Sequence, residues 1–266
     1  MTLKVTILGC GTSGGVPRIG NIWGACDPSN PKNRRSRCSL LVQRAAARGM
    51  TTLLVDSSPD LRQQLLDAEV GLLDGVLYTH DHADHVHGID DLRMVAYNGR
   101  RRIDVYYNEA TGRILRQRFD YCFEVPAGSD YPAILSGHEI RAGEAVSVEG
   151  AGGAIEAVPF RQLHGQTETL GFRFGSIAYS PDVGDFPEET LRHLEGLDVW
   201  IIDALRHTPH PSHLTVEQAL SWIARVKPKR AVLTHMHVDL DYAKLADQLP
   251  EGVEPAYDGM LLTTEG

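Results

Sequence analysis

The stretch Leu77-Tyr78-Thr79-His80-Asp81-His82-Ala83-Asp84-His85 (residues 77–85) joins an apolar strand end to four side chains that can ligate metal within six positions. Imidazole and carboxylate are ligands that zinc, manganese and iron accept in proteins. We expect His80 and His82 to face one ion and Asp84 and His85 to face another. A lone histidine more often only satisfies a hydrogen bond, but the spacing H-x-H-x-D-H predicts a metal site.

Further candidate ligands lie just past other predicted strands. They are His164 after residues 155–160, Asp182 after residues 176–179, and His235 at the end of residues 230–234. The ends of strands in a rigid sheet bring side chains to a shared edge, so seven separated ligands predict a two-metal site. His237 lies two residues after His235 and is an alternative ligand, whereas no ligand role is left for His87.

The hydrophobic pattern predicts a layered α/β protein. Apolar runs rich in Val, Ile and Leu predict strands at residues 3–8, 39–43, 52–55, 75–79, 155–160, 170–174, 176–179, 198–203 and 230–234. Amphipathic patterns predict helices at 59–69 and 215–226, and a further helix near 109–119. We expect a single domain over residues 1–266, in which residues 106–145 form an insertion or a lid over the active site.

Composition narrows the class of protein. With 266 residues, of which 42% are hydrophobic and 23% charged, the chain can bury a large core. The net charge of −9 disfavours a nucleic-acid partner, because such affinity depends on lysine and arginine. Without a leader-like start or a run long enough to span a bilayer, we expect a soluble cytoplasmic protein with no membrane partner. The four cysteines are far apart, which indicates reduced thiols.

The order H-x-H-x-D-H, His, Asp, His resembles the metallo-β-lactamase superfamily over nearly the whole chain. The resemblance implies an αββα sandwich with a dinuclear centre of Zn²⁺ or Mn²⁺. It assigns His80, His82 and His164 to the first ion, Asp84, His85 and His235 to the second, and Asp182 to both. Asp56, which ends Leu53-Leu54-Val55-Asp56, matches the superfamily's early aspartate and is expected to orient a ligand.

Two bridged ions imply hydrolysis by metal-bound hydroxide, with Asp84 as both ligand and catalytic residue. Members with Asp84, His85 and a bridging Asp182 commonly cleave phosphoesters or thioesters, and phosphodiester hydrolysis is the leading expectation. Residues 211–215 resemble the histidine motif of phosphodiesterases in this superfamily, which makes His213 the expected general acid; the alternative is an ordinary residue at a capped helix start.

The opening stretch, residues 6–17, resembles the group that contains the phosphonate-pathway cyclic phosphodiesterase. This resemblance implies a small phosphodiester substrate, including cyclic ribose phosphates. The glycines here either approach phosphate or only permit a tight turn. Some members of the group have a cysteine-rich structural zinc site near this loop, but the presence of only Cys26 and Cys38 speaks against it here.

Several alternatives remain open at this point. A transfer-RNA 3′-processing nuclease shares the metal pattern, but only 17 residues separate His164 from Asp182, which is too short for an RNA-binding arm. Thioester or lactam hydrolysis and a non-catalytic metal-binding regulator are further alternatives, and a homodimer is left open. So is contact with substrate by His207, by His210 or by the basic run at residues 32–37.

Overall fold

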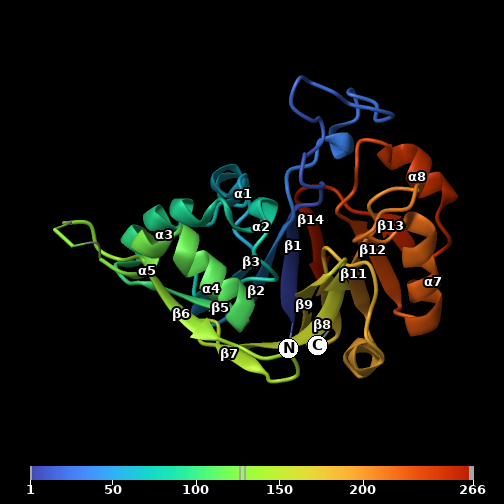
Figure 1. The fold of residues 1–266 in the computed structure, drawn as a ribbon. Helices are drawn as coiled ribbons and strands as arrows, with labels where there is room; N and C mark the ends of the chain where they lie inside the picture. Colours follow the sequence, from blue (N-terminus) through green and yellow to red (C-terminus); the bar gives the residue numbers. More distant parts are fainter. Residues whose placement is uncertain (1, 126, 129, 264–266) are drawn as a thin grey trace.

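The computed structural model describes residues 2–125, 127–128 and 130–263, and its fold is a four-layer αββα sandwich. Two sheets of seven strands each pack face to face, and helices cover their outer faces (Figure 1). The sequence-based expectation of an αββα sandwich is therefore confirmed.

The first sheet has the strand order β14-β1-β2-β3-β4-β5-β6. Its members are β1 (Leu3–Gly9), β2 (Ser39–Ala46), β3 (Gly49–Val55), β4 (Gly75–Leu77), β5 (Ile103–Tyr107), β6 (Leu135–Glu139) and β14 (Met260–Thr263). Strands β14, β1, β2 and β3 are antiparallel, and from β3 to β6 the strands are parallel.

The second sheet has the order β13-β12-β11-β10-β9-β8-β7. Its members are β7 (Val146–Val148), β8 (Ile155–His164), β9 (Thr167–Phe174), β10 (Ile177–Ser180), β11 (Val199–Asp203), β12 (Arg230–Thr234) and β13 (Val253–Pro255). From β7 to β10 neighbouring strands are antiparallel, and from β10 to β13 the strands are parallel. Both sheets thus contain a parallel half. The candidate ligands follow strands of those halves, except for His164, which ends the antiparallel strand β8.

Helices lie outside each sheet. On the first sheet are α1 (Leu61–Asp67), α2 (Ala83–Val86), α3 (Leu92–Gly99), α4 (Glu109–Arg118) and α5 (Asp120–Phe123), and on the second are α6 (Leu191–Leu194), α7 (Val216–Val226) and α8 (Tyr242–Gln248) (Figure 1). Short 3₁₀ turns occupy Pro31–Asn33, Ile89–Asp91 and Glu188–Thr190. Among the described residues, no helix is both long and apolar enough to span a bilayer.

Strands with a buried core on each face have continuous apolar sequences, because successive side chains enter the two cores in turn. In β2, Leu40 and Val42 belong to the core between the two sheets, whereas Leu41 belongs to the core under the helices of the first sheet. Successive side chains of a strand point to opposite faces, so a strand buried on both faces needs apolar residues throughout. Burying each such side chain contributes roughly 1.5–3 kcal/mol.

The described part of residues 106–145, for which an insertion or a lid was expected, contributes two strands to the first sheet. Strands β5 and β6 pair in register within the first sheet, from Ile103 opposite Leu135 to Tyr107 opposite Glu139. Helices α4 and α5 lie between them in the chain and cover the outer face of the sheet (Figure 1). Most of the segment is thus a structural part of the sandwich, and residues 126 and 129 lie outside those described.

Candidate metal centre

The candidate ligands meet at one edge of the sandwich. The segment after β4 supplies His80 and His82, and the short helix α2 that follows contains Asp84 and His85. Three further side chains come from the second sheet: His164 ends β8, Asp182 lies two residues past β10, and His235 directly follows β12. Both sheets must therefore pack together before the full set is assembled.

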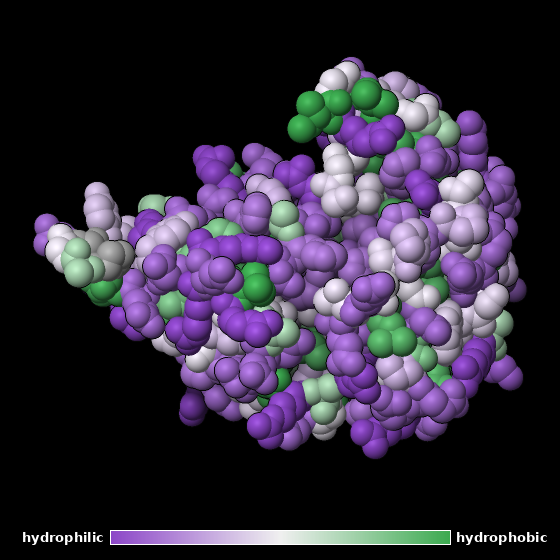
Figure 2. Space-filling view, in the orientation of Figure 1, coloured by the Kyte–Doolittle hydropathy of each residue, from purple (hydrophilic) through white to green (hydrophobic). Residues whose placement is uncertain are grey.

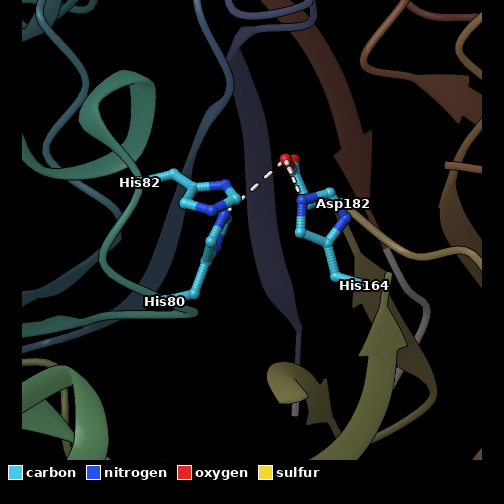
Figure 3. Close-up of side chains that lie close together, drawn as sticks. All are labelled: His80, His82, His164 and Asp182. Carbon is cyan, nitrogen blue, oxygen red and sulfur yellow. Dashed lines mark ion pairs between the residues drawn. The ribbon is translucent and has the colours of Figure 1, made fainter. Parts of the chain in front are cut away.

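The first group contains His80, His82, His164 and Asp182, whose candidate ligand atoms all lie within 4.8 Å of one another (Figure 3). The Oδ2 atom of Asp182 lies 3.7 Å from Nε2 of His80 and 3.9 Å from Nε2 of His164. The rings of His80 and His82 have centroids 4.5 Å apart. Three imidazoles thus converge on one carboxylate oxygen.

The second group contains Asp84, His85, Asp182 and His235, within the same mutual distance of 4.8 Å. Here the other oxygen of Asp182, Oδ1, lies 2.9 Å from Nε2 of His85 and 3.3 Å from Nε2 of His235. The Oδ2 atom of Asp84 lies 3.6 Å from the same nitrogen of His235. One carboxylate therefore faces both groups, one oxygen to each.

Left-handed backbone turns three of the site residues inward where the strands end. Asp56 has φ 62°, Asp182 has φ 39° and His235 has φ 58°. This region is sparsely populated by residues other than glycine, and each such position costs about 1–3 kcal/mol of conformational strain. Packing in the sandwich compensates for that strain, which indicates that these side-chain directions serve the site.

The outer nitrogens of three candidate ligands, His80, His85 and His164, are held by neighbouring groups. His85 Nδ1 donates to Asp56 Oδ2 at 2.7 Å, and His164 Nδ1 donates to the carbonyl of Ser212 at 2.8 Å. Asp56 also accepts the Thr79 hydroxyl, and Thr79 in turn lies 2.9 Å from Nδ1 of His80. Such contacts fix the tautomer and leave Nε2 facing the centre. Asp56 lies where the early aspartate was expected to orient a ligand.

The protonation equilibria of the buried groups are strongly shifted. Burial and the adjacent His85 lower the pKa of His80 well below its usual value. Burial alone would lower the pKa of His85, but Asp182 and Asp84 outweigh it and raise that pKa well above the ordinary range. Burial would raise the pKa of Asp182, but His235 and His85 bring it well below. Asp182 therefore stays ionised, and His80 stays neutral with a lone pair on its ring.

The buried atoms that face the centre fit a cation. Within the part of the chain described, Nε2 of His80, His85 and His235 and Oδ1 of Asp182 are buried and make no well-aligned hydrogen bond. Buried polar atoms without partners are costly, at about 1–3 kcal/mol each. Nitrogen and carboxylate atoms in this arrangement suit divalent metals, which would supply the missing partners.

His213 lies beside both groups and has a carboxylate partner of its own. Its Nδ1 donates to Asp203 Oδ2 at 2.7 Å, and its Nε2 lies 3.9 Å from Asp182 Oδ2. Its ring stacks on that of His235 with centroids 4.5 Å apart. Asp203 was missed in the sequence, although it ends an apolar strand just as Asp56 does. The pattern Val199-Trp200-Ile201-Ile202-Asp203 was the signal that could have found it.

The remaining histidines lie outside the two groups. His87 is exposed and packs against Phe119, and His237 Nδ1 lies 2.9 Å from Asp239. His235, and not its alternative His237, thus lies in the cluster. His207 is paired with Glu217 at 2.6 Å, whereas His210 has its ring centroid 5.0 Å from that of His213.

The basic run at residues 32–37 is engaged in contacts within the chain. Lys32 lies over the rings of Tyr242 and Tyr257, Arg34 over Trp23, Arg35 donates to the carbonyl of Leu240 at 2.7 Å, and Arg37 pairs with Asp60. The neighbouring glycine loop packs closely on this run: a Cβ at Gly9 would lie 2.1 Å from the carbonyl oxygen of Arg37. These contacts favour a structural role for both segments. All four cysteines are free and buried.

Comparison with known proteins gives one family match. The model of the Beta-lactamase superfamily domain matches residues 51–236. This range includes all seven candidate ligands together with Asp56, Asp203 and His213.

Three individual proteins are similar to the chain. The crystal structure of a diphosphatase from the PhnP family is 36% identical, covers 99% of this chain and 98% of its own, and superposes with a TM-score of 0.87. An octanoyltransferase from Porphyromonas gingivalis is 34% identical over 97% of this chain and 51% of its own length. A ribonuclease Z from Bradyrhizobium diazoefficiens is 29% identical over 56% of this chain and 48% of its own. The chain spans about half the length of these two curated relatives.

Proposed function

Because the chain belongs to the β-lactamase superfamily and has the fold of a metal-dependent hydrolase, we propose that it is a phosphoric diester hydrolase acting on small phosphodiesters. The observation that carries the proposal is the position of His213. Its ring lies against the two candidate metal groups, with Nδ1 held by Asp203 and Nε2 directed at the centre. A proton donor in this position suits a reaction with a poor oxygen leaving group.

The residues proposed to hold metal form two groups that share Asp182. His80, His82 and His164 would bind one divalent ion, and Asp84, His85 and His235 a second, with Asp182 shared between them. We propose Zn²⁺ or Mn²⁺, since both accept nitrogen and carboxylate ligands. When bound, two such ions lower the pKa of water and neutralise charge that develops on a phosphoryl group.

The side chains of the protein have separate roles in this proposal. Protonated His213 donates the proton on Nε2 to the departing oxygen, while Asp203 keeps the ring in orientation and compensates its positive charge. Asp84 is proposed as both ligand and catalytic residue, because it lies 3.6 Å from His235 and is mostly buried. Asp56 acts through His85, whose ring it fixes.

The short connection between His164 and Asp182 in the second sheet supports a small substrate. The residues between His164 and Asp182 are taken up by the turn after β8, by β9 and by β10, so no arm for binding RNA extends from this position. The PhnP-family relative is named a diphosphatase, and this name supports the proposal that the reaction cleaves a phosphorus–oxygen bond. The octanoyltransferase name makes acyl thioesters the necessary comparison substrate.

The test is hydrolysis of bis(p-nitrophenyl) phosphate by protein whose metal content has been measured, with Mn²⁺ and Zn²⁺ added separately. Asp84→Ala should lose metal and activity, and His213→Ala should lose activity but keep its metal. His87→Ala is the matched control, since this exposed imidazole lies two residues from His85 and contacts Phe119.

The panel also includes an octanoyl thioester, a lactam and a precursor transfer RNA. Turnover of the phosphodiester that both variants lose and His87→Ala retains supports the proposal. Turnover of one of the other substrates, with none of any phosphodiester, would replace the proposed reaction and leave the metal centre intact. Full metal occupancy without turnover of any substrate would point to a non-catalytic role.

A further inference from the structure

We propose that Arg118 is a positioning residue for the first candidate metal group, because it holds the backbone between His80 and His82. This role rests on the proposed binding of metal and not on the reaction that the centre catalyses. Arg118 is the last residue of α4, whereas the two histidines lie in and after the connection that follows β4. Removal of a group that orients a metal ligand commonly weakens metal binding by about tenfold or more.

The guanidinium of Arg118 contacts Asp81, which lies between the two histidines in the sequence. Its Nη1 donates to the carbonyl oxygen of Asp81 at 2.7 Å, and its Nη2 lies 3.4 Å from Oδ2 of the same residue. An arginine side chain is always protonated and has several N–H donors in one rigid plane, so it can meet a carbonyl and a carboxylate together. The carbonyl contact is the shorter of the two, and it acts directly on the backbone.

The main chain at His80 and Asp81 has little other support. Among the residues described, neither makes a hydrogen bond to another backbone group. Before them, the carbonyl of Thr79 accepts a backbone hydrogen bond from β9, and after them the carbonyl of His82 accepts two from α2. Arg118 therefore supplies a hydrogen bond to a stretch of backbone that neither a sheet nor a helix holds.

His82 is the histidine of the first group that depends most on its backbone. Its side chain is exposed, and within the described part of the chain neither of its ring nitrogens has a hydrogen-bond partner. By contrast, the outer nitrogens of His80 and His164 are each held by a hydrogen bond. The carbonyl that Arg118 binds belongs to the peptide bond between Asp81 and His82, so this contact fixes the peptide plane from which the His82 side chain extends.

The position of Arg118 is itself fixed, because α4 packs closely on the first sheet. A Cβ at Gly112 would lie 2.3 Å from a ring carbon of Tyr107, so glycine allows the helix to approach β5 this closely. Leu115 is fully buried in the core under the helices, and the side chain of Asn108 caps the start of α4. The guanidinium therefore extends from a well-anchored helix end.

The other arginines of α4 lack such a contact. Figure 2 shows that the surface over the helices of the first sheet is mostly hydrophilic. Arg113 is exposed and makes no ion pair or hydrogen bond with the residues described. Arg116 lies over the ring of Phe123 and 3.9 Å from a carboxylate oxygen of Glu124. Arg113 is thus a matched control, with the same charge on the same helix.

The test measures zinc affinity by competition with a chromophoric chelator, with no substrate present. Wild-type protein should bind two ions. We expect Arg118→Ala to bind one ion about tenfold more weakly and the other as before, because Asp84 and His85 belong to α2, which has its own backbone hydrogen bonds. Arg118→Gln, which retains an N–H donor, should recover part of the loss. Arg113→Ala should match the wild type.

Two further backgrounds identify the affected ion. In His235→Ala protein the remaining ion is expected in the first group, and adding Arg118→Ala should weaken its binding about tenfold. In His164→Ala protein the remaining ion is expected in the second group, and the added substitution should change nothing. Asp81→Asn retains the carbonyl and loses the ion pair, so it should stay within about twofold of the wild type, since partly exposed ion pairs contribute little.

An equal loss of affinity for both ions in Arg118→Ala would overturn the proposed role and indicate a general effect on the fold. No loss for either ion would also refute it. A loss in Asp81→Asn as large as in Arg118→Ala would contradict the role of the carbonyl contact. Wild-type protein that binds no zinc would overturn the metal centre itself, whereas two bound ions that depend on Arg118 as expected, without turnover of any substrate, would count only against the proposed reaction.

Discussion

The carboxylate of Asp203 contacts two functional side chains. One oxygen accepts from His213 Nδ1 at 2.7 Å, and the other lies 3.9 Å from Nδ1 of His235. The Val183 backbone N–H also donates to Asp203, which fixes the carboxylate at the base of the site. Asp203 is therefore proposed as a positioning residue that acts through the proton donor.

Asp203→Asn should lower kcat for phosphodiesters by roughly hundredfold, within the range that general acids contribute. An amide in place of the carboxylate removes the acceptor that holds the His213 ring in the correct tautomer and orientation. The diagnostic measurement is the rate for a series of methyl aryl phosphates with leaving phenols of rising pKa. The decline in rate along this series should be steeper in Asp203→Asn, because a weaker proton donor matters most for a poor leaving group.

Asp185→Asn is the control for that series, since Asp185 is an exposed carboxylate near the site that accepts from the backbone N–H of Phe186. An Asp203→Asn protein that loses its metal would reveal support of His235 instead. If the rate declined equally along the series in wild type and Asp203→Asn, the proposal that His213 acts as the general acid would be wrong.

At the scale of the elements, helix α7 begins with a capping box soon after residues 206–213, the loop that contains His213. The hydroxyl of Thr215 accepts from the Gln218 backbone N–H at 3.1 Å, and the Gln218 side chain accepts from the Thr215 backbone N–H at 2.8 Å. The first turn of α7 is therefore stabilised by Thr215 and Gln218 themselves and does not depend on the preceding loop.

Thr215→Ala should lower the free energy of unfolding by about 1 kcal/mol, as is usual for loss of an N-cap. Urea unfolding measures it, with Ser221→Ala as the control on the exposed face of the same helix. Because the loop of residues 206–213 is also held at Ser212, whose carbonyl accepts from His164 Nδ1, the metal content should not change. A loss of metal in Thr215→Ala would mean that the cap, and not the Ser212 contacts, holds the loop.

The strands that the sequence did not reveal share a physical cause. Four of the five, β6, β7, β13 and β14, are the edge strands of the two sheets. An edge strand is short and paired on one side only, so its sequence need not be continuously apolar; β6, for example, reads Leu-Ser-Gly-His-Glu. Interior strands such as β12 (Arg230–Thr234) were predicted at their observed bounds, because burial on both faces fixes their composition.

The candidate site was more predictable than the edges of the fold. The structure brings His80, His82 and His164 into one group and Asp84, His85 and His235 into the other, as the family resemblance implies, while metal ligation by these residues stays a prediction. What the sequence did not give was the set of outer contacts, such as Ser212 with His164 and Thr79 with His80. A backbone carbonyl or a common hydroxyl has no sequence signature, because its role arises only from tertiary packing.

At the scale of the whole molecule, Asp258 ties the end of the chain to its beginning. From the turn before β14 it accepts hydrogen bonds from the backbone N–H groups of Cys10 and Ser36, at 3.1 and 2.6 Å. Burial raises the pKa of Asp258 to about 6, even though these donors favour the charged form. Ionised Asp258 therefore has an energetic cost in the folded state.

The free energy of unfolding should therefore contain a pH-dependent contribution from Asp258. The unfolded chain has an aspartate pKa near 3.9, so the folded protein binds more protons between about pH 4 and pH 6. The free energy of unfolding then falls as pH rises through this window, by about 3 kcal/mol from Asp258 alone. Asp258→Asn should remove that part of the slope in urea unfolding, whereas Asp67→Asn, at an exposed position, should keep it. Parallel pH curves for all three proteins would contradict the assignment.

Neither sheet contains a full set of candidate ligands: His80 to His85 follow a strand of one, and His164, Asp182 and His235 belong to strands of the other. The amount of metal bound should therefore depend on how well the two sheets pack together. A lesion deep between them, for instance at the fully buried Phe160, would be scored in an activity screen as a defect of chemistry. Genetic variants of this protein that lack activity should therefore be sorted by metal content and by stability before any of them is attributed to catalysis.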